Sequence, residues 1–112
     1  MSTFKFDSNI NYKYMNYMEW SKLSCFVALP ESFIRLNADK LNWYYISSKQ
    51  VLSESFIREF TDRVNWRIVS QYQKLSESFI REFADRVDWE LILKYQTLSE
   101  PYRREIKKLI GY

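Results

Sequence analysis

The sequence predicts an all-α fold, namely a short α-solenoid of stacked helical hairpins built from 23-residue repeats. Residues 52–74 and 75–97 are near copies that agree at 15 of 23 positions. Within each copy, apolar residues recur every four positions, as they do on one face of a helix. Residues that favour helix starts recur at two fixed places in each copy. A period of about 20–50 residues is typical of stacked-repeat architectures.

The repeat extends over nearly the whole chain of 112 residues. Moving in steps of 23 from the central pair defines four full units and one truncated unit, at residues 6–28, 29–51, 52–74, 75–97 and 98–112. Hydrophobic residues make up 46% of the chain, which is enough for a continuous core. We therefore expect a single repeat domain over residues 1–112.

The first helix of each unit is expected to begin after a serine such as Ser53, a favourable N-cap. Proline occupies this part of the unit at Pro30 and Pro101, where a missing N–H is tolerated. The apolar stripe at spacing four predicts that the helix continues to a turn at Val64 and Asn65; its residues are Leu52, Phe56, Phe60 and Val64. Acidic residues precede arginines by four, which predicts ion pairs within each helix at Glu31–Arg35, Glu54–Arg58, Glu77–Arg81, Glu59–Arg63 and Glu82–Arg86.

The second helix is expected to begin at Asn42, Asn65 or Asp88, each a good N-cap followed by tryptophan. It is about eight residues long and presents Trp66, Val69 and Tyr72 on one face. Isolated helices shorter than about 12 residues are not stable in water. These helices must therefore stack, and we expect the tryptophan column to fill the core between units; its members are Trp20, Trp43, Trp66 and Trp89.

The consensus unit, with Phe56–Phe60, Asn65-Trp66 and Tyr72-Gln73 as its clearest parts, resembles a short repeat in proteins of large DNA viruses of amoebae and of some bacteriophages. The match is close from Leu29 to Glu100. The resemblance implies a viral helical repeat protein without assigned chemistry. It also implies partner binding and interference with a host function or defence.

Composition argues against an enzyme. The chain has no histidine, a single cysteine (Cys25) and a single glycine (Gly111), so a Cys–His pair, a zinc cluster and a glycine-rich phosphate loop are excluded. We expect no cofactor and no metal, and a core position for Cys25. No apolar run approaches the length of a membrane span, so we expect a cytoplasmic protein without a membrane partner.

Function is more readily sought where the repeats differ. On the second helix, four columns vary while the framework stays constant: Tyr44, Arg67 and Glu90; Tyr45, Ile68 and Leu91; Ser47, Ser70 and Leu93; Ser48, Gln71 and Lys94. Such variation is typical of a binding face, and equally of an unconstrained surface. From these columns we select candidate partner-binding residues, which are Tyr44, Arg67, Glu90, Leu93 and Lys94.

Two basic features offer anion binding instead. Near the C-terminus lies a cluster of cations, a candidate anion site or a helix cap, at Arg103, Arg104, Lys107 and Lys108. Columns of arginine, among them Arg35, Arg58, Arg81 and Arg104, could follow a phosphate backbone or form an ion-pair lattice with neighbouring acidic columns. The first repeat, residues 6–28, is rich in apolar residues that could cover the end of the stack or mediate self-association: Tyr12, Tyr14, Met15, Tyr17 and Met18.

These observations favour a non-catalytic protein that acts through protein–protein interaction. A nucleic-acid-binding protein that uses the arginine columns and the basic last helix is one alternative. A structural virion component is another.

Overall fold

The computed structural model describes residues 5–112, so the first four residues of the predicted repeat domain lie outside the described part. The helices are η1 (Tyr12–Tyr14), α1 (Tyr17–Phe26), α2 (Glu31–Leu36), α3 (Trp43–Lys49), α4 (Glu54–Glu59), α5 (Trp66–Tyr72), α6 (Glu77–Glu82), α7 (Trp89–Tyr95) and α8 (Glu100–Leu109). The predicted all-α repeat array is confirmed. The chain divides into an N-terminal unit that ends at Val64 and a C-terminal unit, Asn65–Tyr112.

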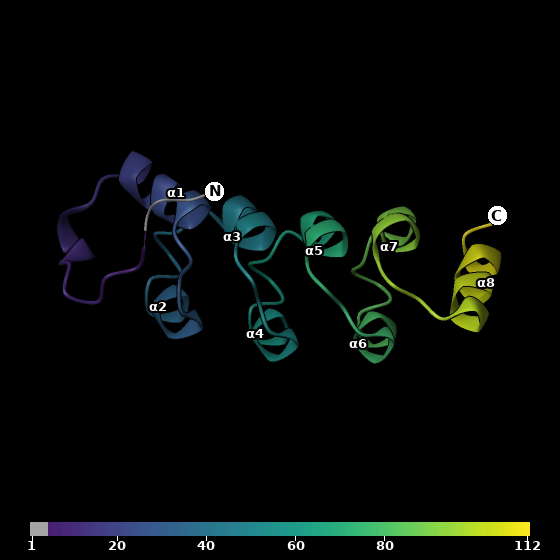
Figure 1. Ribbon diagram of the computed structural model, residues 1–112. Helices are drawn as coiled ribbons and strands as arrows, with labels where there is room; N and C mark the ends of the chain where they lie inside the picture. Colours follow the sequence, from purple (N-terminus) through teal and green to yellow (C-terminus); the bar gives the residue numbers. More distant parts are fainter. Residues whose placement is uncertain (1–4) are drawn as a thin grey trace. The chain divides into compact units, whose positions relative to one another are not determined.

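Within each unit, a helix packs against the next but one. In the N-terminal unit, α1 packs against α3, and side-chain bonds connect α2 with α4 (Figure 1). In the C-terminal unit, α5 packs against α7, and side-chain bonds connect α6 with α8. Lys5 and Ala28 form an isolated parallel β-bridge. Corresponding helices of successive repeats are therefore neighbours, as stacking of a 23-residue hairpin requires.

The predicted helix starts are confirmed. Ser53 is the N-cap of α4, and its hydroxyl accepts a hydrogen bond from the Phe56 N–H at 3.1 Å. Asn65 is the N-cap of α5, and its side chain accepts from the Ile68 N–H at 3.2 Å. Each cap satisfies one of the N–H groups that the first helical turn leaves unpaired.

The predicted end of the first helix is wrong. Helix α4 ends at Glu59, and residues 60–64 form a turn in which the N–H groups of Arg63 and Val64 donate to the Phe60 carbonyl at 2.9 and 3.0 Å. Phe60 leaves the helix to stack on Trp43, with ring centroids 5.3 Å apart. Val64 is nevertheless buried. A spacing of four thus identified core residues without showing that all of them are helical.

The predicted core position of Tyr72 is also wrong, since Tyr72 is 56% exposed while Gln73 is 5% exposed. Tyr72 is the last residue of α5, and Gln73 has extended backbone angles. Helical periodicity therefore no longer determines which side chain points inward at this position.

Tryptophan contributes to the core between repeats, as predicted, although only Trp20 of the four is fully buried. Within each unit, the indole stacks on a phenylalanine of the following repeat. The Trp43–Phe56 ring centroids lie 6.3 Å apart, and the Trp66–Phe79 centroids lie 6.2 Å apart. Because both rings come from different repeats, this packing helps to hold successive repeats together.

In residues 5–112, no helix has the length and apolar character that crossing a bilayer requires.

Candidate functional site

A buried polar side chain connects successive second helices in the N-terminal unit. The Ser24 hydroxyl of α1 donates to the Trp20 carbonyl at 2.8 Å and accepts from the Asn42 N–H at 3.0 Å. Gln50, which follows α3, donates to the carbonyls of Ser24 and Val27 at 2.9 and 2.7 Å and accepts from the Leu29 N–H at 2.9 Å. The carbonyls at the end of one helix, which lack intrahelical partners, are thus satisfied by the next repeat.

The C-terminal unit repeats this arrangement with Ser70 and Gln96. The Ser70 hydroxyl donates to the Trp66 carbonyl at 2.7 Å and accepts from the Asp88 N–H at 3.0 Å. Gln96 donates to the carbonyls of Ser70 and Gln73 at 2.8 and 2.7 Å. Both side chains are buried.

This arrangement corrects the interpretation of one variable column. Ser47 and Ser70 were expected to be exposed, but both have 0% exposure. Within each unit, the column of Ser47 and the columns of Tyr44 and Ser48 lie on the helix face that receives the next second helix. In α1 the equivalent residues are Ser21, Ser24 and Cys25, and the hydroxyls of the first two accept from Asn42, the N-cap of α3. Cys25 was expected in the core but is only half-buried. On α7, the same column has Leu93 in place of the buried serine.

The variable columns become a surface on α7, where they form one side of a groove of about 570 Å³. We call it the α7–α8 groove. Its lining residues are Glu90, Leu91, Leu93, Lys94, Arg103, Lys107 and Tyr112. Of these described residues, Lys94, Arg103 and Lys107 are cationic and Glu90 alone is anionic. The lining of the groove therefore combines two leucines, Leu91 and Leu93, with three cations.

Arg103 is held in place by a backbone contact in the α7–α8 groove. Its guanidinium donates to the Leu93 carbonyl at 2.8 Å. That carbonyl corresponds to the Ser70 carbonyl, which Gln96 satisfies one repeat earlier. Arg103 thus replaces a glutamine amide with a charged donor, and it occupies the column in which Ile57 and Ile80 are buried. This contact supports the capping interpretation of Arg103 and also leaves a cation beside Leu93.

Gly111 orients the last residue that lines the α7–α8 groove. Its φ of 86° lies in the left-handed region, which glycine adopts without a steric cost. The Tyr112 N–H donates to the Lys107 carbonyl at 2.7 Å, and the Gly111 N–H donates to the Lys108 carbonyl at 3.4 Å. These two bonds are the Schellman arrangement that ends many helices. The only glycine in the sequence was the available signal for this turn, which places Tyr112 at the groove.

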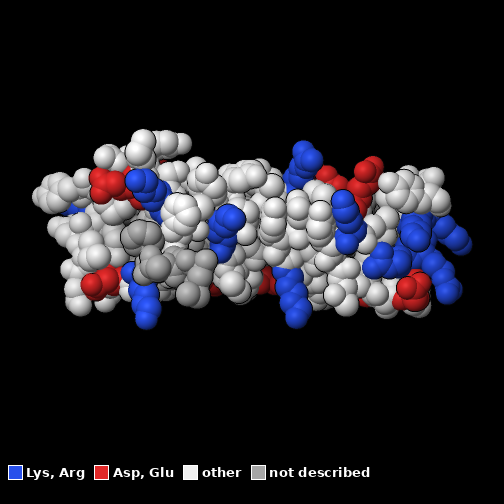
Figure 2. Space-filling model, turned by 45° about the horizontal axis from the view of Figure 1, so that its top comes forward, with Lys and Arg blue, Asp and Glu red and all other residues white. Residues whose placement is uncertain are grey.

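The basic residues of α8 divide between two faces. Figure 2 shows Lys and Arg side chains gathered at its right-hand end, where α8 lies. Arg103 and Lys107 line the α7–α8 groove. Arg104 and Lys108 are exposed and do not belong to its lining, and Lys108 lies instead beside Trp89 and Tyr102. The predicted anion cluster is therefore only partly a single site.

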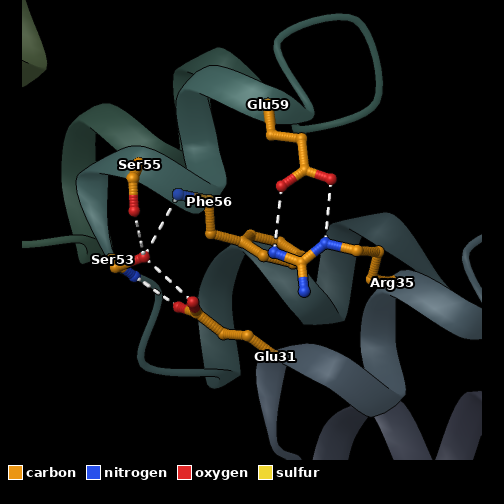
Figure 3. Close-up of polar contacts among 6 residues, drawn as sticks. All are labelled: Glu31, Arg35, Ser53, Ser55, Phe56 and Glu59. Carbon is orange, nitrogen blue, oxygen red and sulfur yellow. Dashed lines mark hydrogen bonds and ion pairs between the residues drawn. The ribbon is translucent and has the colours of Figure 1, made fainter.

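Three arginines form ion pairs with a neighbouring repeat, namely Arg35, Arg63 and Arg81, in place of the predicted pairs Glu31–Arg35, Glu59–Arg63 and Glu77–Arg81. Arg35 of α2 binds Glu59 of α4 through two bonds of 2.8 and 2.9 Å, and its guanidinium lies 5.6 Å from the Phe56 ring centre (Figure 3). Glu31, the expected partner of Arg35, accepts instead from the backbone N–H and hydroxyl of Ser53 at 2.6 and 2.9 Å. Arg35 and Glu31 therefore each form these hydrogen bonds with the neighbouring repeat and not with each other.

The Arg35–Glu59 pair shifts both ionisation equilibria. The hydrogen bond from Arg35 lowers the pKa of the Glu59 carboxyl, and the same bond raises the pKa of Arg35. Arg81 makes the equivalent pair with Glu105 at 2.7 Å, and its guanidinium lies 4.0 Å from the Tyr102 ring centre. Burial raises the pKa of the Tyr102 hydroxyl.

Two of the five candidate partner-binding residues, Tyr44 and Arg67, also lie outside the α7–α8 groove. Tyr44 is 53% exposed on α3 of the N-terminal unit, where its ring packs edge-on against Tyr45 with centroids 5.7 Å apart. Arg67 is exposed on α5. Of the nine candidate residues named from the sequence, five line the groove, and these are Glu90, Leu93, Lys94, Arg103 and Lys107.

Fold and site together define the class of this protein as a short all-α helical repeat array with a charged, partly apolar groove beside α7 and α8 in its C-terminal unit. Comparison with family models, curated proteins and solved structures finds no match. Among residues 5–112, no group of three or more His, Cys, Asp or Glu side chains is placed to hold a metal ion.

Proposed function

We propose that this protein is a non-catalytic binding module that recognises a partner protein through the α7–α8 groove. The carrying observation is that the groove lies on the face with which α1 receives α3 and α5 receives α7. In the C-terminal unit, α5 uses this face to bind α7 through Ser70. On α7, the same face presents Leu93 in place of serine and has Arg103 beside it.

The geometry favours a helical segment as the bound element. A helix that docks beside α7 as α7 docks beside α5 would contact Leu93 with its apolar side. Helix-in-groove binding of this kind uses apolar anchors spaced along one helix face. The cations Lys94, Arg103 and Lys107 favour a helix with acidic residues flanking its apolar side, because complementary charge increases the association rate and the specificity.

The non-catalytic part of the proposal rests on composition. Without histidine, the chain lacks the side chain that most often acts as a general base near neutral pH and that commonly activates a serine or cysteine nucleophile. The repeat's resemblance to viral sequences supports a protein that acts on a host partner. A virion component would also bind protein and would use the same surface.

A nucleic-acid-binding protein is the second candidate, because Arg104, Lys107 and Lys108 are exposed on α8. The arginine columns give it less support. Arg35, Arg63 and Arg81 each form an ion pair with a carboxylate of a neighbouring repeat, at 2.7 to 2.9 Å. Guanidinium groups in such pairs would have to exchange a carboxylate for a phosphate on binding.

Fluorescence anisotropy with defined probes tests the proposal. The probes are a labelled amphipathic helical peptide with leucines on one face and glutamates on the flanks, the same peptide with lysines replacing the glutamates, and a duplex DNA. We expect the acidic peptide to bind, and Leu93→Asp or Lys107→Glu to weaken binding about tenfold or more. Lys74→Glu, a charge reversal at an exposed site outside the groove, should leave binding unchanged.

Three outcomes would contradict the proposal. One is equal binding of the acidic and basic peptides. Another is equal loss of binding in Lys74→Glu and Lys107→Glu. The third is duplex DNA binding that is tighter than peptide binding and falls steeply with salt, which would favour the nucleic-acid alternative. Tyr44→Asp separates the surfaces further, because binding through the α7–α8 groove predicts that this variant keeps full affinity.

A further inference from the structure

A second surface lies on α1, in the N-terminal unit. We call it the α1 surface; its residues are Met15, Glu19, Lys22, Leu23, Phe26 and Val27, which line a groove of about 430 Å³. Phe26 is 51% exposed and the adjacent Met18 is 65% exposed. Exposed aromatic and methionine side chains together are typical of interaction surfaces and uncommon on free ones.

Helix α1 differs from α3 at the positions that bind a preceding helix. Asn42 and Gln50, which flank α3, donate hydrogen bonds to residues of the repeat before it. The equivalent residues of α1 are Glu19 and Val27, which cannot reproduce those amide bonds. The α1 surface therefore does not fit a further repeat docked in the usual way, and it offers apolar contacts instead.

The α1 surface is complementary to itself when two copies meet antiparallel. Residues of a two-fold interface contact reciprocally, so that each residue meets the partner's residue at an equal distance on the other side of the axis. With the axis between Trp20 and Ser21, Glu19 meets Lys22 of the second copy. Met15 precedes α1 and Phe26 ends it, so the two apolar ends of this face meet when the copies lie antiparallel. Each contact pairs opposite charges or two apolar side chains, and the reciprocal contact does the same.

The rest of the N-terminal segment leaves this face accessible among the described residues. Tyr12 is not among its lining residues, and its ring lies 4.9 Å from Phe33, 6.0 Å from Phe6 and 6.3 Å from Trp20 between centroids. Tyr12 thus covers part of the stack, one of the two roles expected for these residues. Tyr14 and Tyr17 are 80% and 81% exposed and border α1.

From this arrangement we propose that two copies of the chain associate through antiparallel α1 helices, with reciprocal Glu19–Lys22 pairs and Met15–Phe26 contacts. The occupant of the α1 surface is then a second copy of this chain. The α7–α8 groove shares no residue with the α1 surface, so that a dimer would carry two binding grooves and gain affinity for a partner with two acidic segments.

Sedimentation analysis from about 1 µM to about 1 mM tests the association across the range from tight to marginal affinity. We expect a concentration-dependent dimer. Lys22→Glu and Glu19→Lys, each alone, should weaken dimerisation about tenfold or more, because each places like charges opposite one another. An equimolar mixture of the two variants should restore a heterodimer, because its pairs are again of opposite charge.

Phe26→Asp should also abolish the dimer, whereas Leu36→Asp, at an 85% exposed apolar side chain on α2, should not. Circular dichroism identifies any variant that fails to fold; Glu19→Lys needs this control because Glu19 accepts from the Asn16 N–H in the capping box of α1. A wild-type chain that stays monomeric throughout would overturn the proposal. A dimer that survives Phe26→Asp, or variants that do not recombine when mixed, would overturn it equally. None of these results depends on peptide binding by the α7–α8 groove.

Discussion

Replacement of Gln96 by leucine tests directly how successive repeats are held together. The side-chain amide makes three bonds: Oε1 accepts from the Leu75 N–H at 3.0 Å, and Nε2 donates to the carbonyls of Ser70 and Gln73 at 2.8 and 2.7 Å. The side chain is 7% exposed. Gln96→Leu would remove all three bonds and leave three backbone groups without these partners.

Each buried polar group that loses its partner costs about 1–3 kcal/mol. Three such groups cost about 3 kcal/mol at the lower figure, and apolar burial of the leucine recovers about 1 kcal/mol. We therefore expect Gln96→Leu to reduce the free energy of unfolding by about 2 kcal/mol or more. Natural domains have a total stability of about 5–15 kcal/mol, so the C-terminal unit would be markedly weakened.

Urea unfolding followed by tryptophan fluorescence measures the change in free energy. Native-state hydrogen exchange adds a local measurement, because the Leu75 amide should lose protection in the variant. Gln71→Leu is the matched control: Gln71 is half-buried on α5, and no side-chain hydrogen bond is found for it within residues 5–112. If Gln96→Leu cost no more than Gln71→Leu, or if the Leu75 amide kept its protection, the proposed bridging role of the glutamine would be refuted.

Three further predictions concern other contacts. Ser70→Ala removes the buried acceptor of the Asp88 N–H and should cost about 1–3 kcal/mol in thermal or urea unfolding; an unchanged midpoint would contradict this. Because the folded-state pKa of Glu59 is lowered by Arg35, their pair stabilises the fold above the ordinary carboxyl pKa of about 4.3, and this contribution is lost as the pH falls through the lower folded-state value. The stability difference between wild type and Glu59→Gln should therefore be constant near neutral pH and shrink in acid; a difference that persists unchanged at low pH would argue against the pair. Gly111→Ala places a Cβ at φ 86° and should cost about 1–2 kcal/mol, detectable as faster exchange of the last amides of α8, while normal protection there would count against the Schellman turn.

Much of the candidate site could be anticipated because it lies where the repeats differ. Leu93 and Arg103 depart from their columns, and both line the α7–α8 groove. Tyr44 departs as clearly, yet it lies on α3, outside that groove. A departure from the consensus therefore marks a change in environment, but it does not show which departures converge in space.

The sequence by itself determined the period, the all-α class and the helix starts, because these depend on local chemistry. An Asn65 or Ser53 side chain caps the helix that follows within three residues, whatever lies beyond.

The tertiary structure alone decided which residues act between repeats. Arg35 pairs with Glu59 across two helices rather than with Glu31 along its own, and Gln73 is buried where Tyr72 was expected. These helices have six or seven residues, so most of their backbone groups and charged side chains lie near an end. Their partners must then come from the neighbouring repeat, and only the stacking of one repeat on the next determines which partner is in reach.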